Sequence, residues 1–393
     1  MTAFGNPSRI ERLRTRMAQA GIDLIVSFKP ENSFYLTGFN PIIYSHPVIA
    51  LLPREGEAQV LLHALRDDHA RASSFVRDIR LYGAWSTKVT MGLHWQAALQ
   101  SLVTEAGFAN AVIGIEEDFL PVSRHRELQG LFPGATFKDV SGLVMLTRLV
   151  KDADEIENCR AAARIADVGM DAAVEAVRAG GSERDIALAS MAAMNRFWAD
   201  TFPDKEVCDF GSLEGGAQNG LWTWALAGER MFMNCDNPTQ RRPAPGECVS
   251  IFIWTIINGI HAENERTVMV GEVPEANRRA LTSILEIREE LFPLLKPSTP
   301  ISALFNGTKA GLEARGYGKY LPGRIGHGIG LGAHEHPSLD ARTDIPLEPG
   351  MIFTLEPNLR MPGIGATQIS DTVLITPDGC EFLTQSVGGL ITA

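Results

Sequence analysis

The pattern of apolar residues changes near residue 150 of this chain. Before that point, short apolar runs typical of buried strands alternate with amphipathic segments typical of helices, starting with residues 9–20 and the run Ile22–Phe28. After it, an acidic first turn beginning at Asp152 opens a long Ala-rich helix that reaches about Arg178. Short strands then dominate, so the two halves of the chain indicate different architectures.

Because 393 residues are many for one hydrophobic core, we predict two domains, residues 1–148 and 149–393. In the first, the runs 48–53 and 58–63 flank a polar Arg-Glu-Gly-Glu turn, which predicts a hairpin. The alternation of strands and helices there predicts an α/β domain with a mixed or parallel sheet. The second half predicts an α+β domain with a curved antiparallel sheet and helices on its outer face. Further helices are expected near residues 94–106, 121–131, 182–199, 274–296 and 301–315.

Composition excludes several classes of partner. The net charge is −11 and the sequence pI is about 5.4, which argues against nucleic acid and anionic membranes and weakly favours a small cationic substrate. Apolar runs stay shorter than the roughly 18 residues of a membrane span, and the N-terminus does not resemble a secretory signal. The 5 cysteines form no CxxC pair, so we expect a reducing, cytoplasmic location.

Chemistry-bearing residues gather in a few segments of the second half. Strand alternation places Trp222 with Trp224 on one face, and likewise Phe252 with Trp254. The same parity places Glu263 and Glu265 together. The remaining segments are Asn234-Cys-Asp-Asn-Pro, Gly326-His-Gly-Ile-Gly-Leu-Gly-Ala-His-Glu-His-Pro, Leu347-Glu-Pro-Gly-Met with Leu355-Glu-Pro, and Ile369-Ser-Asp.

In this order and spacing, the segments resemble the pita-bread family of methionine aminopeptidases, prolidases, aminopeptidase P and creatinase, over almost the whole chain. Its metallopeptidases bind two divalent ions through two Asp, one His and two Glu side chains, and carboxylates of this kind suit hard cations. The resemblance places these five ligands at Phe252, Glu263, His327, Glu356 and Ser370. A phenyl ring cannot ligate and a serine is a poor ligand, while the neighbouring Asp371 should point to the opposite face. We therefore expect no metal cofactor. The alternative is one divalent transition metal held by Glu263, His327 and Glu356.

Creatinase is the family member that works without metal, and two features resemble it. Glu265-Arg-Thr stands at its Glu-Arg-Thr signature, and its Glu-Pro glutamate is kept as Glu356. The sequence departs from creatinase at Asp236-Asn-Pro, where creatinase has its catalytic His in a His-Asn-Pro tripeptide. A substrate cation could then neutralise the acidic cluster, because unpaired buried like charges are costly. The resemblance implies a catalytic set of Asp236, Glu263, Glu265, His327 and Glu356.

Substrate contacts are expected around this set. The Trp pair, Phe252 and Trp254 would form an aromatic wall, of the kind that holds alkylated cations. The substrate-binding candidates are Tyr44, His46, Trp222, Trp224, Phe252, Trp254, His334 and Arg342. The resemblance also implies a homodimer in which the segment Phe39–His46 completes the active site of the partner.

These features lead to one hypothesis and two alternatives. The first is a metal-independent hydrolase that cleaves a C–N bond in a small cationic or zwitterionic metabolite, a guanidino, amidino or cyclic amidine compound, and that is not specific for peptides. The second is a single-metal prolidase-like dipeptidase or lyase of the same fold. The third is a non-catalytic binding protein.

Overall fold

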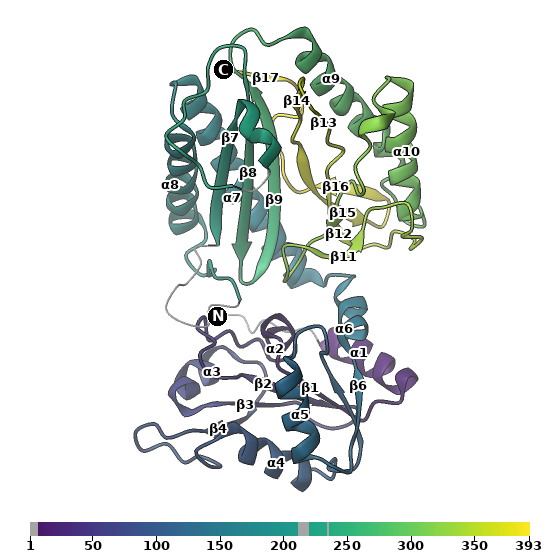
Figure 1. Cartoon of the computed structure of the whole chain (residues 1–393). Coiled ribbons are helices and arrows are strands. Elements are labelled where there is room, and N and C mark those ends of the chain that lie inside the picture. The colour runs from purple at the N-terminus through teal and green to yellow at the C-terminus, as the bar shows by residue number, and fades with distance from the viewer. Residues whose placement is uncertain (1–6, 211–219, 234–235) are drawn as a thin grey trace. The chain divides into compact units, whose positions relative to one another are not determined.

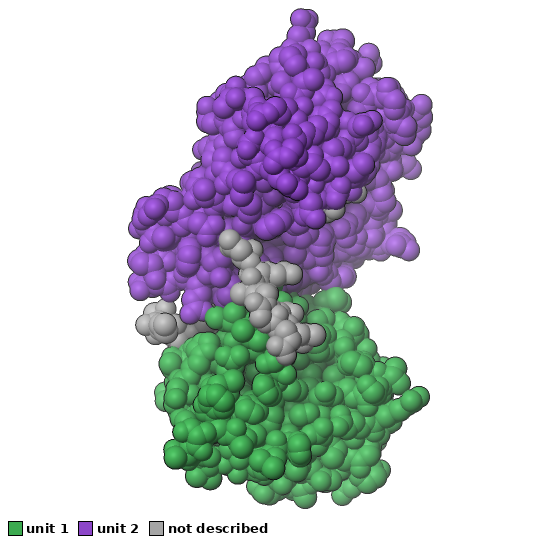
Figure 2. Space-filling view, turned by 60° about the vertical axis from the view of Figure 1, so that its left-hand side comes forward, with its two compact units in different colours: residues 1–148, 209–218 green, residues 149–208, 219–393 purple. Residues whose placement is uncertain are grey.

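A computed structural model describes residues 7–210, 220–233 and 236–393 (Figure 1). Asn234 and Cys235, which precede Asp236 in its motif, lie outside the described residues. The chain divides into two compact units (Figure 2): unit 1 comprises residues 1–148 and 209–218, and unit 2 comprises residues 149–208 and 219–393. Within the described ranges, none of the helices combines the length and the apolar character needed to cross a bilayer.

Unit 1 is built on a mixed six-stranded sheet in the order β4-β3-β2-β1-β5-β6. The predicted hairpin is confirmed, because β2 and β3 pair antiparallel. Strand β1 is buried along its whole length, as its unbroken apolar sequence indicates. The strands are β1 (Leu24–Ser27), β2 (Ile49–Pro53), β3 (Gln59–His63), β4 (Asp78–Tyr82), β5 (Val112–Ile115) and β6 (Thr136–Asp139). The helices are α1 (Pro7–Ala20), α2 (Pro30–Thr37), α3 (Asp67–Ser73), α4 (Trp95–Glu105), α5 (Val122–Leu131) and α6 (Ser141–Arg148).

Unit 2 contains a nine-stranded sheet whose main path runs β11-β10-β12-β15-β9-β8-β7. All pairs on this path are antiparallel, so the predicted fold class is confirmed for both halves of the chain. Strand β16 joins β15, and β17 joins β9. The strands are β7 (Leu221–Ala227), β8 (Cys248–Ile257), β9 (Ile260–Met269), β10 (His327–Gly328), β11 (Glu335–Ser338), β12 (Ile352–Leu355), β15 (Ser370–Thr376), β16 (Gly379–Phe382) and β17 (Ile391–Thr392). A separate two-stranded ribbon joins β13 (Arg360–Met361) to β14 (Gly365–Ala366).

Helix α7 (Ala153–Arg178) begins at a capping box. Asp152 accepts a hydrogen bond from the backbone of Glu155, and the Glu155 side chain accepts one from the backbone of Asp152. The helix packs on β8 and β9 (Figure 1), where Asn264 donates to Asp167 over 2.8 Å. Asn264 alternates with Glu263 and Glu265 along β9, so α7 covers the face of the sheet opposite to these two carboxylates.

The other α-helices of unit 2 pack on the sheet or against the ribbon. Helix α8 (Glu183–Thr201) packs on β7 and begins at a second capping box formed by Ser182 and Asp185. Helix α10 (Ile301–Ala314) contributes Leu304 to a core with residues of β12 and β15. Helix α9 (Glu275–Glu290) packs against the ribbon and α10. These helices leave the other face of the sheet to the carboxylates.

Candidate active site

Strand register brings the predicted site residues of the sheet onto one face. Trp222 is paired with Trp254, which is paired with Glu263. In the neighbouring row, Trp224, Phe252, Glu265 and Ser370 lie on four successive strands, β7, β8, β9 and β15. Residues paired across a ladder point to the same face, so both rows face the same side of the sheet. The carboxylates therefore lie beside aromatic rings.

A histidine and two carboxylates converge at one end of these rows. His327 Nε2 lies 3.1 Å from Glu356 Oε1 and 3.6 Å from Glu263 Oε2. Each of the three residues offers one ligand atom, and these atoms lie within 4.8 Å of one another. His327 and Glu263 are 2 % exposed. The structure thus brings together three residues that span 93 positions of the sequence, from Glu263 to Glu356.

Burial and mutual repulsion set the protonation of this cluster. Burial and the charge of Glu356 raise the pKa of Glu263, and burial with the charges of Glu263 and Glu356 holds the pKa of Glu265 well above its usual range. Burial opposes the charged form of His327, but its two carboxylate partners outweigh burial and raise the pKa of the imidazole to about 10. The same contact lowers the pKa of Glu356 despite burial. His327 and Glu356 therefore form the ionised pair of the metal-free cluster.

Two polar residues hold the cluster in place and were missed in the sequence. Thr354 donates from its hydroxyl to Glu356 and accepts a hydrogen bond from the backbone N–H of His327 over 3.1 Å. Gln368 donates to Glu265 Oε2 over 2.5 Å. The spacing could have predicted both. Thr354 precedes Glu356 by two residues and Gln368 precedes Ser370 by two, and residues two apart lie on the same side of an extended chain.

The loop at Gly326 shows why a glycine precedes His327. Gly326 has a φ of +146°, and a Cβ atom there would lie 2.0 Å from the carbonyl oxygen of Thr354. A side chain at this position would force β10 away from β12 and carry His327 away from Glu356.

The opposite face of β15 carries a separate ion-pair network. Asp371 is fully buried and accepts from Arg266 over 2.7 Å and from Arg288. The prediction that Asp371 points away from the cluster is confirmed, since its register partner is Asn264. Asp371 therefore does not replace Ser370 as a metal ligand.

The aromatic residues form a continuous series of ring contacts. Ring centroids lie 5.9 Å apart for Trp222 and Trp224, 5.3 Å for Trp224 and Trp254, 5.2 Å for Trp254 and His334, and 4.1 Å for His334 and His327. The series links the exposed Trp222 to the buried histidine of the cluster. Burial and the neighbouring His327 lower the pKa of His334 to about 4, so His334 is neutral near pH 7.

A cationic pocket adjoins the cluster. It has a volume of about 480 Å³, and its lining includes Glu356 and Gln368 together with Arg324, Arg342 and Arg360. Arg324 also contributes to lowering the pKa of Glu356. The sequence offered Arg342 and Arg324 as cationic candidates, and the structure adds the guanidinium group of Arg360 to the same pocket.

Asp236 and two residues of unit 1 complete the predicted set. Asp236 is about half exposed, pairs with Arg230 over 3.2 Å, and is not part of the carboxylate cluster. Tyr44 and His46 belong to unit 1, where Tyr44 is buried in a core with Phe39, and His46 is exposed against the ring of His63. Their predicted roles stay predictions.

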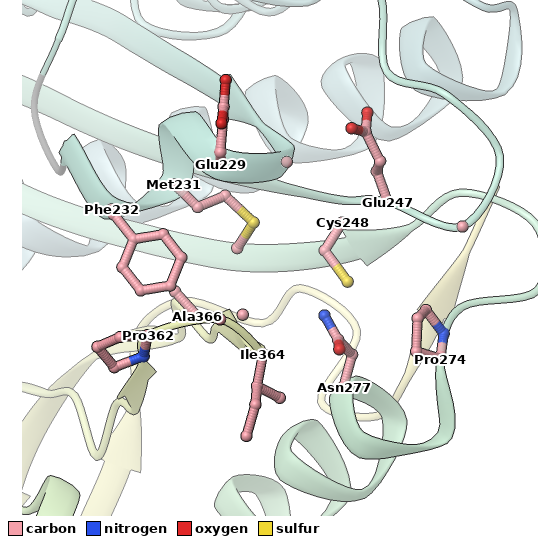
Figure 3. A pocket seen from close by; sticks show the side chains of 14 residues that line it. Glu229, Met231, Phe232, Glu247, Cys248, Pro274, Asn277, Pro362, Ile364 and Ala366 are labelled. Carbon is pink, nitrogen blue, oxygen red and sulfur yellow. The ribbon is translucent and has the colours of Figure 1, made fainter.

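A second pocket lies apart from the predicted residues. It has a volume of about 540 Å³ and is lined by Met231, Phe232, Cys248, Asn277 and Ile364, among others (Figure 3). Burial raises the pKa of Cys248 to about 11, so its thiol is protonated and inert near neutral pH. No predicted site residue lines this pocket.

The donor set fits one divalent ion. Glu263 Oε1 is buried without a hydrogen-bond partner among the described residues, and such a group is costly unless a cation or proton meets it. Two carboxylates and an imidazole nitrogen suit a transition-metal ion. The second position fits poorly, because Phe252 and Ser370 stand at two of the five expected ligand positions.

Comparisons with known proteins place the chain in a family. Residues 157–377 match the model described as "Metallopeptidase family M24", and residues 9–150 match "Creatinase/Prolidase N-terminal domain". The putative dipeptidase YkvY of Bacillus subtilis is 26% identical over 98% of this chain and 99% of its own length. An Xaa-Pro dipeptidase from Bacillus anthracis has a TM-score of 0.83 and 26% identity, over 98% of this chain and 99% of that chain. The prolidase from Pyrococcus horikoshii has a TM-score of 0.79 at 24% identity, over 97% of this chain and 99% of that chain, which shows the shared fold.

These findings correct two predictions. The prediction of a metal-independent, creatinase-like hydrolase for an amidino compound is wrong, because the matched relatives are dipeptidases and prolidases. The prediction of no metal cofactor is wrong for the related reason that the matched family model is one of metallopeptidases. The coarser predictions, a hydrolase with the pita-bread fold, agree with these matches. The chain belongs to metallopeptidase family M24.

Proposed function

We propose that this protein is a metal-dependent dipeptidase that hydrolyses the peptide bond of a small zwitterionic dipeptide, with a divalent ion held by Glu263, His327 and Glu356. The observation that carries the proposal is the convergence of three ligand atoms within 4.8 Å, directly beside a pocket lined by arginines. Relatives named as dipeptidases support the reaction class, and the similarity to an Xaa-Pro dipeptidase suggests testing proline-containing dipeptides first.

When bound, the ion would polarise the scissile carbonyl and lower the pKa of an attacking water. The residues of the chain do the remaining work. Thr354 orients Glu356 and the backbone of His327, which fixes the ligand geometry. Glu265, whose pKa burial and its acidic neighbours raise well above its usual range, can hold a proton on Oε1 while Oε2 accepts from Gln368.

The bond changes balance without a further reactant. Water adds its oxygen to the carbonyl carbon, the C–N bond breaks, the leaving nitrogen takes a proton from the protonated Glu265, and a proton released by the water restores Glu265. Glu265 is the group that we assign to that proton transfer, because burial and its acidic neighbours raise its pKa and so favour the protonated form that can donate. His334 is neutral and can donate a hydrogen bond to the substrate.

The two sides of the cluster suit the two ends of a dipeptide. The substrate carboxylate would meet Arg324 and Arg342 in the 480 Å³ pocket, where a guanidinium can bind a carboxylate with two hydrogen bonds. The other residue of the dipeptide would pack on the aromatic series of Trp222, Trp224 and Trp254. Asp236 has no role in this scheme.

The test combines metal analysis with turnover. Purified protein is stripped with a chelator, reloaded with Mn²⁺, Co²⁺ or Zn²⁺, and supplied with a panel of dipeptides that includes Xaa-Pro. We expect turnover that needs the metal and that is lost in Glu263→Gln and His327→Gln. The control Glu286→Gln, in an exposed ion pair with Arg315, should keep full activity. Absence of turnover by the loaded protein for every dipeptide, with ligand binding retained, would favour the non-catalytic alternative.

Two further expectations, one from the family resemblance and one from cysteine usage, stay within this proposal. We expect a homodimer in which residues 39–46 complete the partner's site, and we expect a cytoplasmic location. Light scattering of the purified protein tests whether it is a homodimer. Turnover by a mixture of the variants His46→Ala and Glu263→Gln tests whether one subunit complements the other.

A further inference from the structure

Three neighbouring strands close one side of the acidic cluster. Phe252 on β8 is paired with Glu265 on β9, and Glu265 is paired with Ser370 on β15. The paired side chains point to the same face, so a phenyl ring, a carboxylate and a hydroxyl stand in one row. All three residues are at most 4 % exposed. We call Phe252, Glu265 and Ser370 the closing row.

The closing row lacks the chemistry of an ion site. The phenyl ring of Phe252 has no lone pair to donate, and the neutral hydroxyl of Ser370 is a weak ligand for a divalent cation. Glu265 is the one carboxylate of the row, and its Oε2 already accepts from Gln368 over 2.5 Å. An ion placed here would have at most one charged ligand, which does not offset its loss of hydration.

The neighbouring acidic residue cannot supply the missing ligand. Asp371 follows Ser370 directly but points to the other face, where Arg266 and Arg288 hold it. Moving it into the site would leave both guanidinium groups unpaired and would shift β15 by one residue against β9. Among the residues that the structure describes, Glu263, His327 and Glu356 are the group of three that could hold an ion.

We propose that this chain binds one divalent ion, held by Glu263, His327 and Glu356, and that the closing row has lost the ligands that a second ion would need. The proposal rests on the proposed function only for the presence of the first ion. The chain would then be a one-metal enzyme, although its resemblance to the pita-bread metallopeptidases implies a pair of ions. The proposal assigns the loss of the second ion to two side chains, Phe252 and Ser370.

Metal stoichiometry tests the proposal without reference to activity. Native mass spectrometry and calorimetric titration of the full chain with Mn²⁺ should give one ion per chain, and the bound Mn²⁺ should show the electron paramagnetic resonance spectrum of an isolated ion. Two tightly bound ions, with the spectral coupling expected of metals roughly 3.5–4 Å apart, would overturn the proposal and leave the proposed function intact. Absence of any bound ion would overturn both.

Restoring carboxylates to the closing row tests the assignment to particular residues. The double variant Phe252→Asp with Ser370→Glu should bind two Mn²⁺ ions per chain. Its matched control, Phe252→Asn with Ser370→Gln, has nearly the same shape without the charges and should bind one. A folded double variant that still binds one ion would refute the role of these two residues. If the double variant does not fold, the single variant Ser370→Glu should still gain weak binding of a second ion, and its failure to do so would count against the proposal.

Discussion

His334 and His327 lie ring against ring, with centroids 4.1 Å apart, yet their pKa values shift in opposite directions. Two carboxylates, Glu263 and Glu356, outweigh burial at His327 and raise its pKa to about 10. At His334, burial together with the positive charges of His327 and Arg324 outweighs the opposing charge of Glu356 and lowers the pKa to about 4. The contrast shows that the carboxylates concentrate negative potential at one imidazole, where a metal ion would bind.

The first prediction concerns pH and the metal-free protein. Because the folded-state pKa of His327 is above its unfolded value of 6.5, its contribution to stability is complete below about pH 6.5 and is lost as the pH rises through about 10. The chelator-treated protein should therefore unfold more easily at pH 10 than at pH 7 in thermal melts. Since ligation needs the neutral imidazole, the affinity for Mn²⁺ should rise by about tenfold per pH unit over the same range.

The control for this prediction is His327→Gln, which has no titrating group at this position. The loss of stability that deprotonation of His327 causes at alkaline pH should be absent from this variant. An unchanged pH profile in this variant would show that another group causes the alkaline loss.

The second prediction concerns the support of the metal ligands. Thr354→Val removes the hydroxyl that donates to Glu356 and accepts from the backbone of His327, while it keeps the side-chain shape. Loss of a residue that hydrogen-bonds to a metal ligand typically weakens metal affinity by about 10- to 100-fold. Competition calorimetry measures the effect, with Thr392→Val on the exposed end of β17 as the control. Equal affinity in both variants would contradict a positioning role for Thr354.

The third prediction concerns the ion-pair network behind the site. Asp371→Asn leaves Arg266 and Arg288 without their buried counter-charge and should lower the free energy of unfolding by about 3–5 kcal/mol. The exposed pair of Glu286 and Arg315 offers the contrast, because Glu286→Gln should cost about 0–1 kcal/mol. Urea unfolding compares the two variants. Metal stoichiometry should stay unchanged in both, since Asp371 faces away from the cluster.

The fourth prediction concerns recognition of the substrate carboxylate. Arg342→Gln removes a guanidinium from the pocket beside Glu356. A hydrogen bond to a charged group contributes roughly 1.5–3 kcal/mol, so KM for a dipeptide should rise by about 10- to 150-fold with a smaller change in kcat. The same dipeptide with an amidated C-terminus should be a poor substrate for both proteins. Equal use of acid and amide by the unaltered protein would reject this role for the pocket.

Several features of the fold follow directly from local sequence. The helix predicted from Asp152 to about Arg178 is α7, Ala153–Arg178, because its acidic capping box and Ala-rich repeat act within the helix itself. The helix expected at 274–296 ends earlier, at Glu290, and Phe292-Pro-Leu forms a 3₁₀ turn, since proline lacks the N–H that would extend the helix. Helix α2, Pro30–Thr37, was not predicted, because nearly all of its residues are buried and it has no polar face to produce a helical period.

The sequence by itself determined which side chains share a face. A strand alternates strictly, so the common face of Glu263 and Glu265, and the opposite direction of Asp371, could be predicted from numbering alone. Only the tertiary structure decided which strands lie together. It placed Gln368 against Glu265, and it brought Glu263, His327 and Glu356 within ligand distance. The motif showed that two expected ligands were missing and therefore favoured a metal-free site. Metal binding depends instead on whether the remaining ligand atoms, those of Glu263, His327 and Glu356, come close together, and strand register decides this.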